Sequence, residues 1–472
     1  MQPILTVAEM QAVDAAAQAA TPMDVLVERA GTAVAVAALR MLGGAYGRHV
    51  VVVAGRGNNG ADGRVAADLL RRRGARVTVV EPATPALPPA DLVIDAAYGT
   101  GFRGGYQAPV VTAGTPVLAV DIPSGVLGDS GAAAGRVLAA DRTVTFAARK
   151  PGLVQGDGVA LAGVVTVADI GLPAGTARAH LVEDADIARL VPARLRDDNK
   201  WSSAVLVVAG SPGMTGAAGM CARAAYRAGA GMVRLGVPGA DLGDSPASEA
   251  VGVELPSHGW AEVALEQAGR CRAIVVGPGL GRDPGTADQV RALLAGTTVP
   301  VVVDADGLFA LGRLDAAAPL RPEPTVVLTP HDGEYRRLLD GAPGPDRLAA
   351  ARRLAEASGS IALVKGSTTA VAHPDGEVLV AMAGSPRLAS AGTGDVLSGV
   401  IGALLARGVS PLEAAALGAH LHGRAAGRGR PEGLVAGDLP DLVSSVLADL
   451  RPVGGAGDDD GHRHDDGHGV RG

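Results

Sequence analysis

The sequence predicts an α/β protein of two domains, each with a mostly parallel sheet between helices. The chain has 472 residues, and because a domain usually spans about 100–200 residues, two or three domains are expected. Short β-branched runs alternate with helical segments, which is typical of doubly wound sheets. A new series of such runs starts after residue 182, and this restart predicts the second domain.

The first half is expected to open with a helix and to form a Rossmann-like, three-layer αβα sandwich. Its first strand ends in a glycine turn that leads into the helical segment RVAADLLRRRG. Ligands of such folds bind at the carboxyl ends of the strands, where the turn motifs of this half lie. The expected strands are HVVVVA in residues 49–54, RVTVVE in 76–81, DLVIDAA in 91–97 and PVLAVD in 116–121.

The second half is expected to start with a helix in VEDADIARLVPARL and to extend to about residue 450. The domain boundaries follow from this restart, with one domain in residues 1–178 and the other in 181–452. The expected strands are AVLVVAG in residues 204–210, AIVVG in 273–277, VPVVVD in 299–304, TVVLTP in 325–330 and IALVK in 361–365.

Composition and charge exclude several classes of protein. The net charge is −7 and no Lys/Arg stripe is interleaved with aromatic residues, so nucleic acid is not an expected partner. No run approaches about 18 apolar residues and no basic segment precedes an apolar one at the N-terminus, so we expect no membrane contact and a cytoplasmic location. Cys221 and Cys271 lack a CxxC spacing, which fits reduced thiols.

The turn after the first strand carries both glycines and polar side chains. Gly55, Gly57 and Gly60 match the dinucleotide-binding pattern G-x-G-x-x-G. Such a triplet can also serve only close packing of a helix on a strand. Asparagines and an aspartate within the same turn supply more oxygen-bearing groups than a pyrophosphate loop needs, which favours a site with a further function.

Together with DAAYGTGFRGG and DIPSG, this turn resembles the NAD(P)HX epimerase domain, known as the YjeF N-terminal family, over about the first 178 residues. The resemblance implies a potassium ion held by Asn59, Asp95 and Ser124, whose hard oxygen atoms suit such a cation. The family usually has glycine where this chain has Ala61. The resemblance implies that the hydrated nucleotide binds to Asn58, Asn59, Gly60, Ala61, Asp62, Gly99, Thr100, Gly101, Phe102, Arg103, Gly104, Gly105 and Asp121.

Asp121 is the predicted proton-transfer residue of this half. It follows a buried strand, where partial desolvation is expected to raise the pKa of its carboxyl group into a useful range. The alternative is an aspartate that only caps the following turn.

In the second half, the stretch SAGTGDVLSG places a glycine turn at the start of an apolar helix. Converging backbone N–H groups and the positive end of that helix suit a phosphate, and Asp395 at the junction is a candidate acid or base. Lys365, with a glycine and three hydroxyl residues after it, suits phosphate contacts, although a lysine in a salt bridge is the alternative. His331 follows a strand end, where a hydrogen-bonded structural histidine is the alternative.

Six motifs of this half occur in the order seen in ribokinase-like proteins: DNKWSSAVLVVAGSPGMTGAA, GPGLGRD, VVVDADGL, TPHDGEYRRLL, LVKGSTTAV and GTGD. They look most like the ADP-dependent NAD(P)HX dehydratase branch, the YjeF C-terminal family, over about residues 181–450. A ribokinase-like αβα domain is therefore implied. The family usually has histidine where this chain has Asn199. The resemblance implies substrate contacts at Ala217, Gly281, His331 and Asp395, and nucleotide contacts at Lys365, Gly366, Ser367, Thr368, Thr369 and Gly394.

The predicted function is repair of hydrated nicotinamide cofactors. The first domain would interconvert R and S NAD(P)HX with K⁺, and the second would dehydrate S-NAD(P)HX with ADP and Mg²⁺. The chain is expected to form a homo-oligomer, although no particular residue implies it. The alternatives are a ribokinase-like small-molecule kinase fused to a nucleotide-binding domain, and a first domain that only binds. Residues 453–472 are expected to be disordered, with weak zinc or nickel binding by their Asp and His residues as the alternative.

Overall fold

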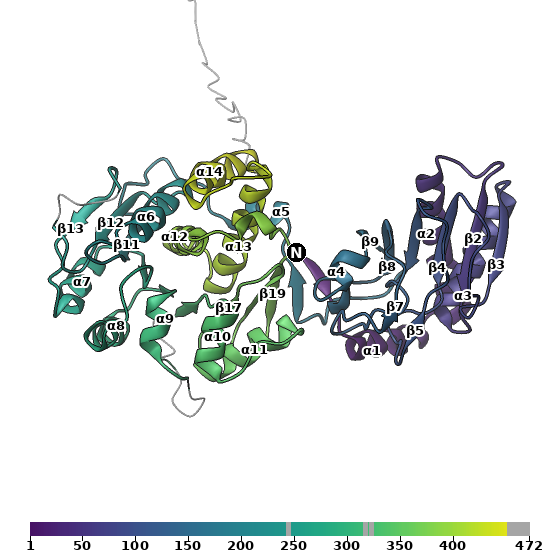
Figure 1. Cartoon of the computed structure of the whole chain (residues 1–472), viewed down its shortest axis with the longest axis horizontal. Coiled ribbons are helices and arrows are strands. Elements are labelled where there is room, and N and C mark those ends of the chain that lie inside the picture. The colour runs from purple at the N-terminus through teal and green to yellow at the C-terminus, as the bar shows by residue number, and fades with distance from the viewer. Residues whose placement is uncertain (242–246, 315–319, 321–324, 451–472) are drawn as a thin grey trace, which may run out of the picture.

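The chain forms two lobes that meet near the N-terminus (Figure 1). This computed structural model describes residues 1–241, 247–314, 320 and 325–450. The predicted tail of residues 453–472, with its possible metal ligands, lies outside the described residues.

The first lobe contains a six-stranded parallel sheet in the order β3-β2-β4-β6-β8-β9. The four strands expected in this half are confirmed as β2, β3, β4 and β6. The strands are β2 His49–Ala54, β3 Arg76–Val80, β4 Leu92–Ala96, β6 Val117–Val120, β8 Arg142–Phe146 and β9 Val164–Ala168, and a separate ribbon pairs β5 Tyr106–Gln107 with β7 Gly135–Arg136.

The predicted opening helix is two helices, α1 Val7–Gln18 and α2 Met23–Leu42. Thr6 and Glu9 form a capping box at the start of α1, and Pro22, which has no N–H group, precedes α2. With α3 Asn58–Arg72 these helices cover one face of the sheet. The opposite face is covered mainly by connecting segments between residues 87 and 140, while the short α4 Gly158–Leu161 lies beside them.

The second lobe contains an 11-stranded sheet in the order β1-β10-β19-β18-β17-β16-β15-β14-β11-β12-β13. The strands from β13 to β17 in this order are parallel, β18 is antiparallel to both neighbours, and β1 is antiparallel to β10. The strands are β1 Gln2–Ile4, β10 Ala179–Leu181, β11 Ala204–Val208, β12 Met232–Gly236, β13 Val251–Val253, β14 Ala273–Val276, β15 Val301–Val303, β16 Val326–Leu328, β17 Ile361–Val364, β18 Thr369–Ala372 and β19 Val378–Ala381.

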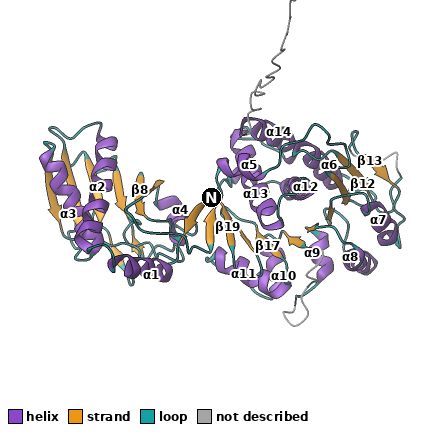
Figure 2. Cartoon of the chain, turned by 180° about the vertical axis from the view of Figure 1, so that it is seen from behind, coloured by secondary structure: helices purple, strands orange, loops and turns teal. Residues whose placement is uncertain are grey.

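Helices cover both faces of this larger sheet (Figure 2), which gives the expected αβα arrangement. Alternate side chains of each central strand face the two helical layers, so Val205 and Val207 lie in one core and Leu206 and Val208 in the other. One layer contains α5 Asp184–Leu190, α6 Gly216–Arg227, α12 Thr393–Ala406, α13 Pro411–Arg428 and α14 Leu439–Leu450, and the other contains α7 Trp260–Ala268, α8 Pro284–Gly296, α9 Asp306–Leu311, α10 Asp332–Leu339 and α11 Arg347–Ser358.

The first residues of the chain lie in the sheet of the second lobe. Strand β1 pairs with β10, and the N-terminal ammonium group of Met1 forms an ion pair with Asp186 at 2.7 Å. The chain then crosses to the first lobe and returns through β10. The boundary near residues 178–181 stays a prediction, but residues 2–4 contribute a strand to the other lobe.

In the part of the chain that the structure describes, no helix combines the length and apolar character needed to cross a bilayer.

Replacing Gly399 with alanine should destabilise the second lobe by about 1–3 kcal/mol. A Cβ atom at this position in α12 would lie 2.2 Å from the carbonyl oxygen of Cys221 in α6. Gly427→Ala is the matched control, because Gly427 is exposed in α13 with nothing within 4 Å of its Cβ position, and alanine is favoured over glycine in a helix. Thermal unfolding should give a lower Tm for the first variant only. An unchanged Tm for Gly399→Ala would contradict the close packing of the two helices.

Candidate functional site

The first lobe contains a cavity of about 690 Å³ at the carboxyl ends of β2, β4 and β6. Doubly wound sheets bind ligands at this edge. The structure therefore brings together polar side chains from three separate turn motifs. The cavity is lined by these members of the predicted set: Asn58, Asn59, Asp62, Gly99, Thr100, Gly101, Phe102 and Asp121.

The glycine turn after β2 serves both packing and the cavity. A Cβ atom on Gly60 would lie 2.0 Å from the carbonyl oxygen of Gly55, and one on Gly55 would lie 2.0 Å from that of Ala97. These two glycines are therefore required by backbone packing. Gly57 has nothing within 4 Å of its Cβ position and lines the cavity.

Several residues of the predicted substrate set lie outside the cavity wall formed by the described residues. Phe102 is in the wall, and its ring lies 5.0 Å from that of Tyr98. The members that do not line the cavity are Gly60, Ala61, Arg103, Gly104 and Gly105.

Asp121 lies at the end of β6 and is held by donors on both carboxylate oxygens. The backbone N–H of Thr100 donates to Oδ2 at 2.8 Å, and the Thr100 hydroxyl donates to the same atom. Thr145 donates to Oδ1 at 3.1 Å, and Nζ of Lys150 lies 2.7 Å from Oδ1. The backbone of Asp121 has a φ of 68°, which is uncommon for a residue other than glycine, and such strain is often found at functional sites.

The predicted increase in the pKa of Asp121 is wrong. Burial alone would raise the pKa, but the Lys150 ammonium and the Thr100 donors outweigh burial and hold the pKa below its ordinary value. Asp121 is therefore a carboxylate at neutral pH. This state favours a proton acceptor over a donor.

Lys150 belongs to the candidate site and was missed by the sequence interpretation. Only 1% of its side chain is exposed, and its ammonium group donates to Thr145 Oγ1 at 2.8 Å and to the carbonyl oxygen of Phe146 at 3.0 Å. It follows β8, a parallel strand, so the rule that polar residues after parallel strands meet at one edge could have found it. Its partner Asp121 lies 29 positions earlier, and no local pattern joins the two.

Asp62 faces the same cavity in the opposite protonation state. Burial, followed by the negative charge of Asp121, raises its pKa to about 8. Asp62 is thus mainly protonated at neutral pH and can donate a proton. Asp14 from α1 also lines the cavity, and burial is the main reason that its pKa is raised.

One of the three predicted potassium ligands, Asp95, has a buried carboxyl group that is hydrogen-bonded to another, Ser124. Asp95 is fully buried, and its Oδ2 accepts the N–H of Ser124 at 2.9 Å. No ion pair joins Asp95 to a cationic side chain among the described residues, and burial raises its pKa. The Nδ2 atom of Asn59 is also buried, and it has no hydrogen-bond partner among the described residues. A buried carboxyl group that has no cationic partner among the described residues and is hydrogen-bonded to Ser124 fits a site for a monovalent cation.

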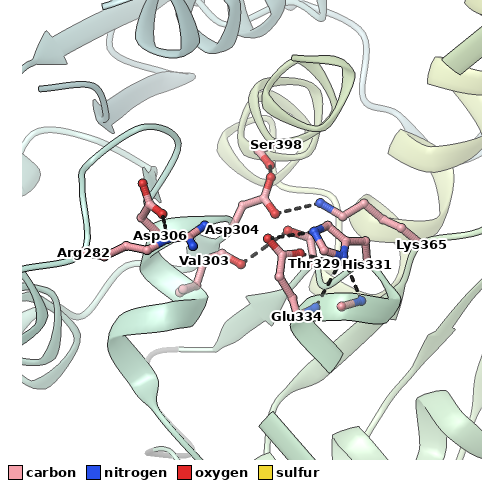
Figure 3. A network of polar contacts seen from close by, with 10 residues as sticks. Arg282, Val303, Asp304, Asp306, Thr329, His331, Glu334, Lys365 and Ser398 are labelled. Atoms are coloured by element: carbon pink, nitrogen blue, oxygen red, sulfur yellow. Dashed lines mark hydrogen bonds and ion pairs between the residues drawn. The ribbon is translucent and has the colours of Figure 1, made fainter. Parts of the chain in front are cut away.

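The candidate site of the second lobe is organised around Asp304, which follows β15 (Figure 3). Its Oδ1 lies 2.7 Å from Nζ of Lys365, and its Oδ2 accepts the hydroxyl of Ser398 at 2.7 Å. A Cβ atom on Gly394 would lie 3.3 Å from that Nζ, so the glycine lets the backbone of the GTGD turn approach the pair. Asp304 and Ser398 belong to motifs read from the sequence but were given no role there.

Asp395 lies in the first turn of α12, next to this ion pair. Burial, followed by the negative charge of Asp304, raises its pKa to about 6, and the positive charge of Lys365 opposes the increase. The first N–H groups of α12 belong to the same turn, and no side chain of the described residues caps this end of the helix. The turn therefore combines anion-binding donors with a carboxyl group that is ionised at neutral pH.

His331 has the structural role that the sequence left open. Its Nδ1 accepts the N–H of Gly333 at 2.9 Å and caps α10, while 61% of its side chain stays exposed. Glu334 returns a hydrogen bond to the backbone of His331. Gly281 donates its N–H to Asp306 at 3.0 Å, which fixes the turn after β14. Ala217 lies in the first turn of α6, with its Cβ facing Gly279.

The loop of residues 365–369, predicted to contact the nucleotide, makes hydrogen bonds and an ion pair of its own. Lys365 forms the ion pair that the alternative reading anticipated. The hydroxyl of Thr368 is buried and donates to the carbonyl oxygen of Val154 at 2.7 Å, so this hydroxyl faces the first lobe. Thr369 donates to the carbonyl oxygen of Gly366 at 3.4 Å.

Comparison with known proteins gives matches in both halves. The family model described as NAD(P)H-hydrate dehydratase matches residues 205–448, and the one described as YjeF-related protein N-terminus matches residues 23–87 and 79–152. The bifunctional NAD(P)H-hydrate repair enzyme of Moorella thermoacetica is 38% identical over 514 residues, which cover 95% of this chain and 97% of the relative.

Solved structures resemble the second lobe. A ribokinase-like superfamily protein from Enterococcus faecalis has a TM-score of 0.50 at 22% identity and covers 58% of this chain and 97% of its own, which indicates the same fold. The ADP/ATP-dependent NAD(P)H-hydrate dehydratase from Bacillus subtilis, co-crystallised with ATP and Mg²⁺, has a TM-score of 0.48 at 26% identity and covers 57% of this chain and 98% of its own.

Asp62→Asn should make the protein more stable than the wild type, by an amount that grows as pH rises. The folded wild type keeps a proton on Asp62 up to a pKa of about 8, whereas the unfolded chain loses it near 3.8, so wild-type stability falls across this interval. Asparagine does not titrate. The difference in Tm should therefore increase from pH 4 to about pH 8 and then level off.

Asp68→Asn, at an exposed position of the same helix, is the control and should show no such trend. A Tm difference for Asp62→Asn that is constant with pH would contradict the protonated state of Asp62.

Proposed function

Because the chain belongs to the family of bifunctional NAD(P)H-hydrate repair enzymes, we propose that its two sites divide the two reactions between the lobes. The chain is an NAD(P)H-hydrate epimerase and an ADP-dependent NAD(P)H-hydrate dehydratase. The first lobe interconverts the R and S hydrates of the nicotinamide ring. The second lobe converts the S hydrate back to NAD(P)H.

The observation that carries the epimerase proposal is the pair of aspartates with opposite protonation states in one cavity. Asp62 is mainly protonated at neutral pH and Asp121 is ionised. Groups with pKa values pushed apart in this way divide the roles of acid and base.

Epimerisation then proceeds through loss and return of water. Asp62 donates its proton to the ring hydroxyl, which leaves as water while the lone pair of the ring nitrogen stabilises the cation. A water molecule adds to the opposite face of the ring and gives a proton to Asp121. The reverse direction exchanges the two roles, and proton exchange with solvent restores the starting state.

Asn59, Asp95 and Ser124 would hold potassium in this lobe. The support for this assignment is the buried carboxyl group of Asp95, which has only hydrogen-bond donors as partners among the described residues. A bound cation would supply the compensating positive charge at the edge of the cavity.

In the second lobe, Asp395 would accept the proton of the ring hydroxyl as that oxygen attacks the terminal phosphorus of ADP. The bond from this phosphorus to the bridging oxygen breaks and AMP leaves. Phosphate then departs from the ring with loss of a ring proton to water, which restores the double bond. The N–H groups at the start of α12 and the Lys365 ammonium stabilise the transferred charge, and Mg²⁺ would accompany the nucleotide.

Exchanging the proton-accepting aspartate of each lobe for asparagine should separate the two activities. Asp395→Asn should lower the rate of dehydration by about 10²-fold or more and leave epimerisation intact, because the proton acceptor of only one lobe is lost.

Asp121→Asn should slow conversion of pure R hydrate while S hydrate is still repaired. Initial rates with each pure epimer measure both effects. Near-normal turnover of S hydrate by Asp395→Asn would overturn the assignment.

Asp304→Asn should move the acid limb of the dehydratase pH profile below about pH 6. Protonation of Asp395, with its pKa of about 6, sets that limb, and removing the Asp304 charge that raises this pKa should lower it. The measurement is kcat/KM for S hydrate as a function of pH. The quantity compared is the pH of the acid limb, which does not change if the variant is slower at every pH.

Asp288→Asn on the exposed face of α8 serves as the control. An acid limb that stays near pH 6 in Asp304→Asn would show that Asp395 does not set it.

A further inference from the structure

A buried glutamine joins the two lobes at the start of α11. Gln155 follows a short 3-10 helix, Pro151–Leu153, in the first lobe and is fully buried. Its Oε1 accepts the backbone N–H groups of Arg347 at 2.9 Å and of Leu348 at 3.3 Å. Its Nε2 donates to Asp346 Oδ1 at 3.2 Å. These three partners belong to the second lobe, at a helix that lies beside the junction in Figure 1, and a fourth hydrogen bond joins Nε2 to the carbonyl oxygen of Asp129 in the first lobe at 2.6 Å.

These contacts complete the N-terminus of α11. The first N–H groups of a helix have no partner within the helix and need acceptors from elsewhere. The N-cap Asp346 accepts the N–H of Ala349 at 3.0 Å, which leaves the two preceding N–H groups to Gln155. The amide of Gln155 is thus used on both sides, as acceptor toward the helix and as donor toward its cap.

Arg347 connects Gln155 to the loop of residues 365–369. Its guanidinium donates to Asp332 Oδ1 at 2.7 Å and to the carbonyl oxygen of Lys365. A Cβ atom on Gly366 would lie 2.8 Å from the same guanidinium group, so the arginine lies directly against the loop backbone. Lys365 then reaches Asp304 through its ammonium group.

A second contact joins the same segment of the first lobe to the same loop. The hydroxyl of Thr368 donates to the carbonyl oxygen of Val154, the residue before Gln155. Thr368 is 4% exposed, so bulk water does not reach this hydrogen bond. The loop is therefore held from the first lobe at two points.

We propose that Gln155 is a positioning residue, supplied by the first lobe, that fixes the nucleotide loop of the dehydratase through Arg347. This proposal rests on the proposed function of residues 365–369 as that loop. Gln155 does not touch the reacting atoms. It sets the backbone against which the nucleotide binds, so its loss should weaken nucleotide binding more than it slows the chemical step.

The other end of this segment reaches the epimerase site. Lys150, which forms the ion pair with Asp121, is five positions before Gln155. Residues 150–155 therefore contact the catalytic carboxylate of one lobe and the loop of the other.

Gln155→Met tests the proposal, with Gln2→Met as the matched control. Methionine is close in size to glutamine and removes the hydrogen bonds. Gln2 also joins the lobes, since it donates to Glu183 and accepts from Arg149, each at 2.7 Å, but it does not touch the loop. Both variants are expected to lower Tm. Only Gln155→Met should raise the KM for ADP, by about tenfold, with kcat within about twofold of wild type.

Hydrogen exchange of the full-length protein gives a readout that needs no activity. Amides in residues 347–349 and 365–369 should exchange faster in Gln155→Met than in Gln2→Met. Equal exchange in the two variants, or an unchanged KM for ADP, would overturn the proposal. A wild-type protein that does not use ADP would instead refute the proposed function, while the exchange result still decides the contact. If Gln155→Met does not fold, Thr368→Val replaces it, because this change breaks the neighbouring hydrogen bond to Val154. Thr368→Val should give the same faster exchange in residues 365–369. Unchanged exchange in this variant would also overturn the proposal.

Discussion

Both lobes bury an aspartate at the carboxyl end of a parallel strand, where a negative charge is stable only beside a cation or several donors. Asp121 is paired with Lys150, and Asp304 is paired with Lys365, each at 2.7 Å. Each ion pair fixes one negative charge, and this charge helps to raise the pKa of a neighbouring carboxyl group, Asp62 in the first lobe and Asp395 in the second. The proposed acid and base groups of both reactions therefore depend on a buried ion pair. In the first lobe the aspartate of that pair, Asp121, is itself the proposed proton acceptor, whereas in the second lobe Asp304 takes no proton.

Close approach of backbone to these charged groups requires glycine at particular positions. A Cβ atom on Gly99 would lie 2.9 Å from the carboxylate of Asp121, and one on Gly394 would lie 3.3 Å from the ammonium group of Lys365. The two glycines belong to different motifs and different lobes. In both cases the missing side chain leaves room for a ligand or for N–H groups beside the ion pair, which is the physical reason that the glycine turns and the aspartates occur together.

The lobes are not independent of one another. Strand β1, from the beginning of the chain, extends the sheet of the second lobe, and the first lobe supplies acceptors to the N-terminus of α11 through Gln155. These contacts use main-chain groups of the second lobe that would otherwise be left unpaired at a sheet edge or a helix end. A fused chain can satisfy such groups with its own distant segments, so the junction adds order to the nucleotide loop as well as linking two activities.

The sequence by itself determined the α/β class, most of the strands and the turns that carry the sites, because alternation of apolar runs with glycine turns is a local property of the chain. It also placed Asp121 and Asp395 correctly at strand or helix ends. Only the tertiary structure decided their partners. The expected increase in the pKa of Asp121 was wrong because burial was visible in the sequence pattern, whereas the ammonium group of Lys150, 29 positions later, was not. The strand at residues 2–4 and the hydroxyl of Thr368 facing Val154 have the same origin, since pairing between distant segments depends on how the whole chain packs and not on any local pattern.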